Sequence, residues 1–279
     1  MTMMMRLPEG KAKVLTLSYD DGTVHDIRMV EILDKYGLKA TFNINSSHFL
    51  PENKNSSESG RYLTDAAEAK KLYSAGGHEI ALHTVTHPWI QALSSVQVLQ
   101  EVLEDRKNIE REFGIIARGM AYPFGCFNDE VVEALRLSGI AYSRTTVSSE
   151  RFNFPDDWLR LGATCHHINP RLMELAKQFV EEQPRWGLCN MFYLWGHSYE
   201  FNNNNNWEVL EEFAELTGGR DDIWYATNIE IYDYVTAYNR LETSVDCKII
   251  HNPTAVKLWF AKDGEIMSIE PGETITVLP

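Results

Sequence analysis

Short apolar runs alternate with longer amphipathic segments along the first 240 residues of the chain. The apolar runs have the length and composition expected of buried strands, and they lie at residues 14–17, 38–44, 78–82, 115–122, 140–143, 159–163, 191–194 and 223–226. Apolar residues at helical spacing, with capping residues or glycine at the ends, predict helices at residues 25–36, 65–76, 95–113, 128–138, 171–182, 207–216 and 227–238.

This order of elements, strand then helix about seven or eight times, favours an α/β fold with parallel strands joined by crossover helices. A closed (β/α) barrel is the simplest arrangement for that many repeats, and an open doubly wound sheet is the alternative. A dinucleotide-binding version of the open sheet is disfavoured, because no G-x-G-x-x-G sequence follows the first strand.

The pattern changes near Leu241, where short alternating β segments separated by turn sequences replace the strand and helix repeats. These segments carry no cluster of catalytic residue types. We therefore divide the chain into a barrel at residues 1–240 and a small C-terminal antiparallel β appendage at residues 241–279. Covering an edge of the barrel and self-association into a homo-oligomer are both open roles for the appendage.

The net charge of the chain limits the classes of partner that it is expected to bind. The 279 residues carry a formal net charge of −14, which disfavours nucleic acid and an anionic membrane surface. A neutral or cationic substrate is easier to accommodate. No run of 18 apolar residues is present, so no membrane span is expected. The N-terminus, Met1 to Pro8, is too short and interrupted for a signal peptide, and we expect a cytoplasmic protein.

Four polar clusters directly follow predicted strands: Asp20-Asp21, His83 with His87, Tyr122 to Gly125, and His197. The carboxyl ends of the strands of a parallel barrel share one face, which is where active sites form. Each cluster alone has an ordinary structural explanation, such as a polar turn or a buried histidine. Their convergence on one face is therefore the argument for a site.

The first two clusters offer metal ligands. The adjacent carboxylates of Asp20 and Asp21 repel each other, and a cation removes the conflict, since one can bind it while the other acts beside it as a base. His83 and His87 point the same way if their segment turns helically. Two imidazoles and one carboxylate suit a catalytic divalent ion, of which zinc is the favoured one. His197 near such an ion could protonate a leaving group.

These clusters resemble the motifs of the polysaccharide deacetylases, carbohydrate esterase family 4. Ser18-Tyr19-Asp20-Asp21-Gly22 resembles that family's T-F-D-D-G motif, and His83-Thr84-Val85-Thr86-His87 resembles its H-[ST]-x-x-H motif. Pro123-Phe124-Gly125 resembles the end of its R-x-P-[YF]-G motif, and Leu194-Trp195-Gly196-His197 resembles its L-x-x-H motif. The matches occur in the family's order over about residues 13–240, and they imply a distorted (β/α) barrel of about seven strands.

The resemblance also implies roles. The metal ligands would be Asp21, His83 and His87. Asp20 would be the general base and His197 the general acid, and the backbone N–H of Phe124 would help hold the oxyanion. Two positions depart from the family pattern. The third-motif arginine, which tunes the base, aligns with Ala121, and Arg118 three residues earlier would not occupy the same place. The fourth motif, an Asp-Trp pair, is matched only by Asp157-Trp158.

The residues and this resemblance together predict a metal-dependent hydrolase that removes an acetyl group from a carbohydrate, with an N-acetyl group preferred to an O-acetyl group. In this hypothesis a metal-bound water attacks, Asp20 takes its proton, and His197 protonates the amine as the linear amide C–N bond breaks. Hydrolysis of another amide, including a small cyclic one, at the same metal site is a second hypothesis. A third is a non-catalytic carbohydrate-binding relic of the enzyme fold.

Overall fold

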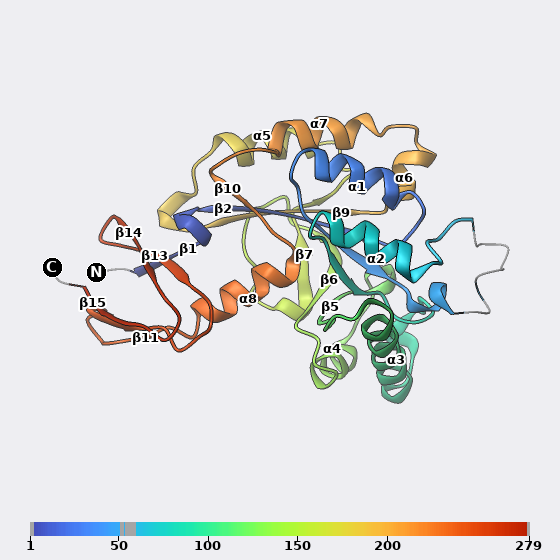
Figure 1. The fold of residues 1–279 in the computed structure, drawn as a ribbon, viewed down its shortest axis with the longest axis horizontal. Coiled ribbons are helices and arrows are strands. Elements are labelled where there is room, and N and C mark those ends of the chain that lie inside the picture. Colours follow the sequence, from blue (N-terminus) through green and yellow to red (C-terminus); the bar gives the residue numbers. More distant parts are fainter. Residues whose placement is uncertain (1–2, 51–52, 54–59, 278–279) are drawn as a thin grey trace.

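The computed structural model describes residues 3–50, 53 and 60–277 of the chain (Figure 1). Nine strands form the main sheet: β2 (Lys13–Asp20), β3 (Ala40–Ile44), β4 (Glu79–Leu82), β5 (Gly119–Ala121), β6 (Tyr142–Ser148), β7 (Leu161–Ala163), β8 (Cys165–His166), β9 (Asn190–Gly196) and β10 (Ile223–Tyr225). Their order is β7-β6-β5-β4-β3-β2-β9-β8, with β10 paired to the start of β2. Every pair in this sheet is parallel, as the alternation of strands and helices predicts.

The two ends of this strand order are consecutive in the sequence, because only Thr164 separates β7 from β8. The segment 161–166 pairs with β6 through its first half and with β9 through its second half. It therefore links the two edges of the sheet. The predicted fold class, an α/β distorted barrel of about seven strands, is confirmed.

Eight α-helices accompany the strands in the described part of the chain: α1 (Asp26–Lys35), α2 (Ala66–Ala75), α3 (Ser95–Phe113), α4 (Asp129–Leu137), α5 (Leu172–Glu181), α6 (Ser198–Asn203), α7 (Glu208–Thr217) and α8 (Asn228–Tyr238). In Figure 1, α1, α5 and α7 lie above β2 and β9, whereas α3 and α4 lie below β5 and β6. The ends of α3 follow from its sequence. Ser94 and Gln97 form a capping box at its start, and Gly114 ends it in the left-handed conformation.

The strand β6 extends to Ser148, whereas the sequence predicts an end at residue 143. The difference arises at Arg144, because a charged residue is not expected in the interior of a buried strand. Arg144 is nevertheless only 1% exposed. Its guanidinium pairs with Asp20 and lies 4.2 Å from the centre of the Trp195 ring, so its charge is compensated inside the barrel.

The C-terminal segment forms short antiparallel strands: β11 (Glu242–Thr243), β12 (Ile249–His251), β13 (Leu258–Lys262), β14 (Glu265–Ile269) and β15 (Thr274–Thr276). The sequence does not predict β1 (Met3–Arg6), which pairs with β13 in a sheet of order β1-β13-β14. A second sheet has the order β11-β12-β15. The hydroxyl of Tyr234 in α8 donates to the Arg6 carbonyl and accepts from the Trp259 N–H, which holds these strands against α8. The domain boundary at residue 240 stays a prediction.

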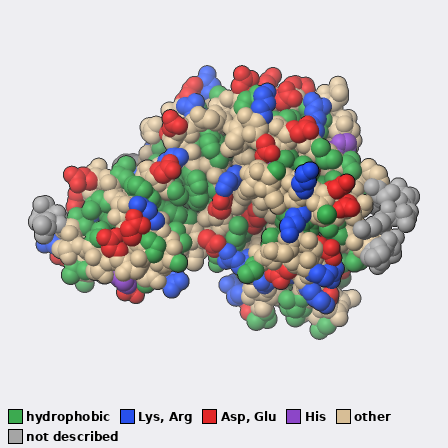
Figure 2. All heavy atoms as spheres, in the orientation of Figure 1, with side chains coloured by type: hydrophobic (Ala, Val, Ile, Leu, Met, Phe, Trp, Pro, Cys, Tyr) green, Lys and Arg blue, Asp and Glu red, His purple; other side chains and the backbone are tan. Residues whose placement is uncertain are grey.

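The surface in Figure 2 carries basic side chains scattered among acidic ones, and no extended basic patch is visible on that face. Among residues 3–50, 53 and 60–277, every helix is too short or too polar to cross a lipid bilayer.

Candidate active site

A cavity of about 720 Å³ opens where β2, β4, β5 and β9 end. Every residue to which the sequence assigns a role lines it: Asp20, Asp21, His83, His87, Phe124 and His197. These side chains come from four separate parts of the chain, and parallel pairing of the strands brings them to the carboxyl-terminal end of the barrel. The predicted convergence of the four polar clusters is therefore observed.

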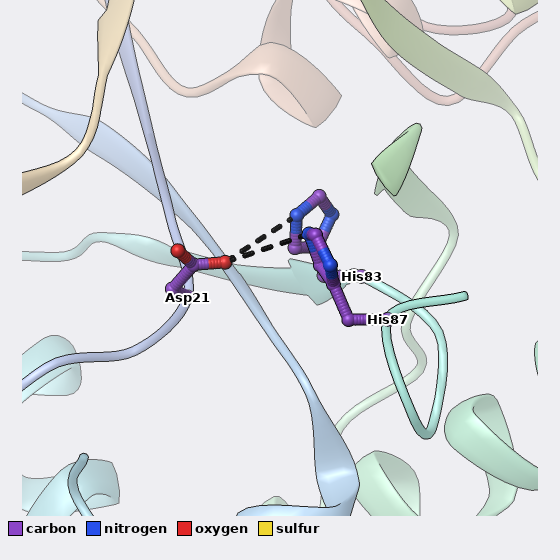
Figure 3. Close-up of side chains that lie close together, drawn as sticks. All are labelled: Asp21, His83 and His87. Carbon is purple, nitrogen blue, oxygen red and sulfur yellow. Dashed lines mark ion pairs between the residues drawn. The ribbon is translucent and has the colours of Figure 1, made fainter. Parts of the chain in front are cut away.

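Asp21, His83 and His87 are close enough together to hold one cation. Asp21 Oδ1 lies 3.6 Å from His83 Nε2 and 3.8 Å from His87 Nε2 (Figure 3). One ligand atom from each residue lies within 4.8 Å of the other two. His83 Nδ1 is 2.8 Å from the Ala121 carbonyl, which can only accept, so Nδ1 carries the proton. His83 Nε2 therefore keeps its lone pair directed toward Asp21, as a metal ligand requires.

The backbone around these ligands is strained. Four non-glycine residues of the site have positive φ angles: Asp21 (77°), Thr84 (66°), His87 (55°) and Phe124 (57°). Hydrogen bonds hold the loop after β4 in this shape, because Asn45 Nδ2 donates to the carbonyls of His83 and Thr84, and Thr84 Oγ1 accepts from the His87 N–H. Strain of this kind is found where a site must be preorganised.

Asp20 is a buried carboxylate with fixed partners for both oxygens. Asn43 Nδ2 donates to Oδ1 at 2.9 Å, and the Arg144 guanidinium donates to Oδ2. Burial on its own would raise the pKa of Asp20, but the guanidinium charge of Arg144, together with the hydrogen bond that it donates, acts in the opposite direction, and that pKa is lowered. Asp20 is consequently an anion at neutral pH, next to the metal-ligand group but not part of it.

Arg144 was not recognised as a site residue from the sequence. It approaches Asp20 from β6 and supplies the guanidinium that the family motif would place at Ala121. Arg118 is directed elsewhere, since it pairs with Asp233 at 2.6 Å in a partly exposed position. The available signal was an arginine immediately after the apolar run 140–143, in the position of a continuing buried strand.

His197 is held at Nδ1 by one carboxylate and directs Nε2 toward a second. Its Nε2 lies 3.9 Å from Asp20 Oδ2, and its Nδ1 lies 3.3 Å from Glu200 Oε2. Burial on its own would lower the pKa of His197, but the hydrogen bond with Glu200 and the nearby carboxylates raise it. Glu200, which the sequence analysis missed, is the acidic partner of His197. Asp157 instead caps the short helix Trp158–Arg160 and pairs with Arg160.

A second group of potential ligands, His166, His167 and Glu200, lies beside His197. Its proton arrangement differs from that of the first group. His166 Nδ1 accepts from the Ile168 N–H at 3.1 Å, so the neutral ring carries its proton on Nε2, which faces Glu200 Oε2 at 3.3 Å. His167 Nε2 is 3.2 Å from the same oxygen. Burial on its own would raise the pKa of Glu200, yet the contacts with the three histidines hold it far below its usual range. His166 and His167 therefore stabilise the carboxylate form of Glu200.

Replacing His166 with alanine is therefore expected to leave the metal content of the protein unchanged. Replacing His87 with alanine, the matched change in the first group, should remove most of the metal, because only two protein ligands remain. Metal analysis by mass spectrometry after dialysis distinguishes the two variants. A loss of one metal equivalent in His166→Ala would show that the second group also holds an ion.

Comparison with known proteins agrees with the sequence motifs. The sequence profile of the polysaccharide deacetylase family matches residues 8–143. A chitooligosaccharide deacetylase of Sinorhizobium fredii is 28% identical over 149 residues, which are 52% of this chain and 60% of that protein. The alignments span less than two thirds of the length of the first curated relatives.

Solved structures extend the likeness to about four fifths of the chain. A family 4 carbohydrate esterase from Streptomyces lividans, in complex with acetate, has a TM-score of 0.50 at 16% identity, covering 76% of this chain and 91% of that chain. A family 4 pseudoenzyme from Bacillus anthracis has the same TM-score at 18% identity, covering 82% of this chain and 68% of that chain. Because the identities are low, these likenesses establish the fold alone.

Proposed function

Because residues 8–143 match the sequence profile of the polysaccharide deacetylase family, we propose that the protein is a metal-dependent hydrolase that removes acetyl groups from a carbohydrate, N-acetyl groups in preference to O-acetyl groups. The observation that supports this most is the separation of tasks within one cavity. Two imidazoles and one carboxylate face one another, while a second carboxylate and a third imidazole beside them are each held by partners of their own.

We propose that Asp21, His83 and His87 hold a divalent ion, with zinc favoured by this ligand set. The residues fit such an ion, because His83 uses Nδ1 for the Ala121 carbonyl and directs Nε2 at Asp21, and because burial lowers the pKa of His87, which favours its neutral ring. When bound, the ion would act as a Lewis acid on the acetyl carbonyl and lower the pKa of a bound water to about 7.

The residues around this group supply the proton transfers. Asp20, held as an anion by Arg144, would accept the proton of the attacking water. The N–H of Phe124, in a strained left-handed residue at the cavity wall, would donate to the oxyanion, a contact of the type worth about 3–4 kcal/mol. His197, whose pKa is raised, would carry the proton to the leaving amine.

Acetate release from a panel of acetylated compounds tests the proposal. After zinc loading, N-acetylated glucosamine oligomers should release acetate and leave free amines. Cyclic amides and ureides release no acetate, so their ring opening is followed as loss of the starting compound, and ring opening in place of acetate release would favour the second hypothesis. A protein that contains one metal equivalent and releases no acetate from any N- or O-acetylated sugar would contradict the proposal.

A relic that only binds sugar remains a distinct alternative, because the fold also occurs in a pseudoenzyme. The anchored pairs of Asp20 with Arg144 and of His197 with Glu200 favour catalysis, since sugar binding alone requires neither a tuned base nor a tuned acid. Turnover in the same acetate assay separates the two alternatives, and sugar binding without turnover would support the relic.

A further inference from the structure

Two aromatic side chains form an exposed stack at the mouth of the cavity. The ring centres of Trp89 and Phe124 are 4.3 Å apart, and the ring planes differ by 9°. Trp89 is 58% exposed and Phe124 is 49% exposed, although both are large apolar side chains. Each ring covers one face of the other. Much of the remaining apolar area is open to water, which is the arrangement expected of a binding surface and not of a core contact.

This stack continues directly into the candidate active site. Phe124 lines the cavity, and its ring centre is 4.4 Å from that of the metal-ligand candidate His87, with the planes at 72°. The three rings therefore lie in a row, with Trp89 at the outer end. The order of these rings follows from the chain, because Trp89 is two residues after His87 and Phe124 follows β5, the neighbour of β4 in the sheet.

We propose that Trp89, backed by Phe124, is a subsite for a second sugar ring of an acetylated oligosaccharide whose acetylated unit occupies the cavity. This inference rests on the proposed function and specifies its substrate as a chain of at least two units. A pyranose presents a face of C–H groups that can cover an exposed aromatic ring, and a neutral sugar is not repelled by the acidic chain.

The occupant follows from continuity with the cavity. Phe124 and His87 lie between Trp89 and the place where an acetyl group would react. A sugar unit bound on Trp89 would therefore be adjacent to the acetylated unit in the cavity. A single sugar in the cavity would leave the Trp89 face uncovered. The subsite would therefore favour longer oligosaccharides, and its loss should reduce the hydrolysis of long substrates more than that of short ones.

Dependence on chain length provides the test. The ratio of kcat/KM for the N-acetylglucosamine tetramer to that for the monomer should fall about 3- to 10-fold in Trp89→Ala. Trp89→Phe should retain most of the ratio. Ile116→Ala is the matched control, because Ile116 is 77% exposed but precedes β5 at its amino end, away from the cavity. An unchanged ratio in Trp89→Ala would overturn the subsite.

Binding gives a readout that does not require turnover. In an Asp20→Asn background, the tetramer should change the tryptophan fluorescence, and Trp89→Ala should remove most of that change and weaken binding by a similar factor. Retention of full affinity would contradict the subsite. A change in sedimentation coefficient in Trp89→Ala, with the chain-length ratio intact, would show that the stack contacts another protein molecule instead. Failure of the proposed function would appear separately, as wild-type protein that binds the tetramer without releasing acetate.

Discussion

Replacing Asp20 with asparagine is expected to reduce kcat for acetate release by about 10²- to 10⁴-fold, the range for loss of a general base. Asparagine preserves the shape of the side chain and can still contact Asn43, but it cannot accept a proton from water. The metal content should remain that of the wild type, because the proposed ligands are Asp21, His83 and His87.

The matched control is Asp21→Asn, one residue along the same turn. This change removes a charged ligand, so metal content and activity should fall together. Stopped acetate assays on zinc-loaded samples, with metal analysis of the same samples, give both quantities. Wild-type activity in Asp20→Asn would show that Asp20 is not the base. Loss of metal in Asp20→Asn would show that the two adjacent aspartates share the ligand role.

Replacing Arg144 with methionine is expected to have the largest effect on stability, a loss of about 3–5 kcal/mol in the free energy of unfolding at pH 7. Asp20 is 3% exposed, and methionine would leave its buried charge without the guanidinium. Activity should also fall, because burial would then favour the protonated carboxyl and remove the base. Urea unfolding of the metal-free protein gives the stability, and acetate assays give the activity.

The pH dependence of this effect has a definite sign. The folded-state pKa of Asp20 is lowered, so the stabilisation is complete above the unfolded pKa of about 3.9 and is lost as the pH falls through the folded value. The difference in stability between wild type and Arg144→Met should therefore be larger at pH 7 than at pH 3. An equal difference at both pH values would indicate that Arg144 acts through packing on Trp195 instead.

Two further variants separate charge from packing. Arg118→Met should change the free energy of unfolding by less than about 1 kcal/mol, because its pair with Asp233 is partly exposed to solvent. The double variant Asp20→Asn with Arg144→Met should recover much of the stability lost in Arg144→Met, since no unpaired charge is then buried. A double variant as unstable as the sum of the single changes would contradict the ion-pair explanation.

Much of the fold could be predicted from the sequence because its long elements are strongly periodic. The helix α3 has the predicted bounds, β2 ends at Asp20, and β4 ends one residue before His83. Short elements were missed. The strand β8 has two residues, and β1 is separated from its partner β13 by most of the chain. Pairing between distant segments leaves no local pattern in the sequence.

The site residues also differ in how far they can be predicted from the sequence. The motifs contain the residues that face the cavity, so His83, His87 and Phe124 could be found from the sequence. Their partners could not. Arg144 and Glu200 belong to none of the matched motifs, and only the folded barrel shows which carboxylate or imidazole each of them contacts. Partners of this kind can be replaced from another strand if the charge reaches the same atom.

We propose above that Asp21, His83 and His87 together hold one catalytic cation. Anomalous X-ray scattering from a zinc-loaded crystal, collected on both sides of the zinc absorption edge, tests it most directly. We expect one strong peak within about 2.0–2.2 Å of Asp21 Oδ1, His83 Nε2 and His87 Nε2, with Asp20 still paired to Arg144. A zinc-loaded crystal with no peak among these three atoms, or with its peak between His166, His167 and Glu200, would contradict it.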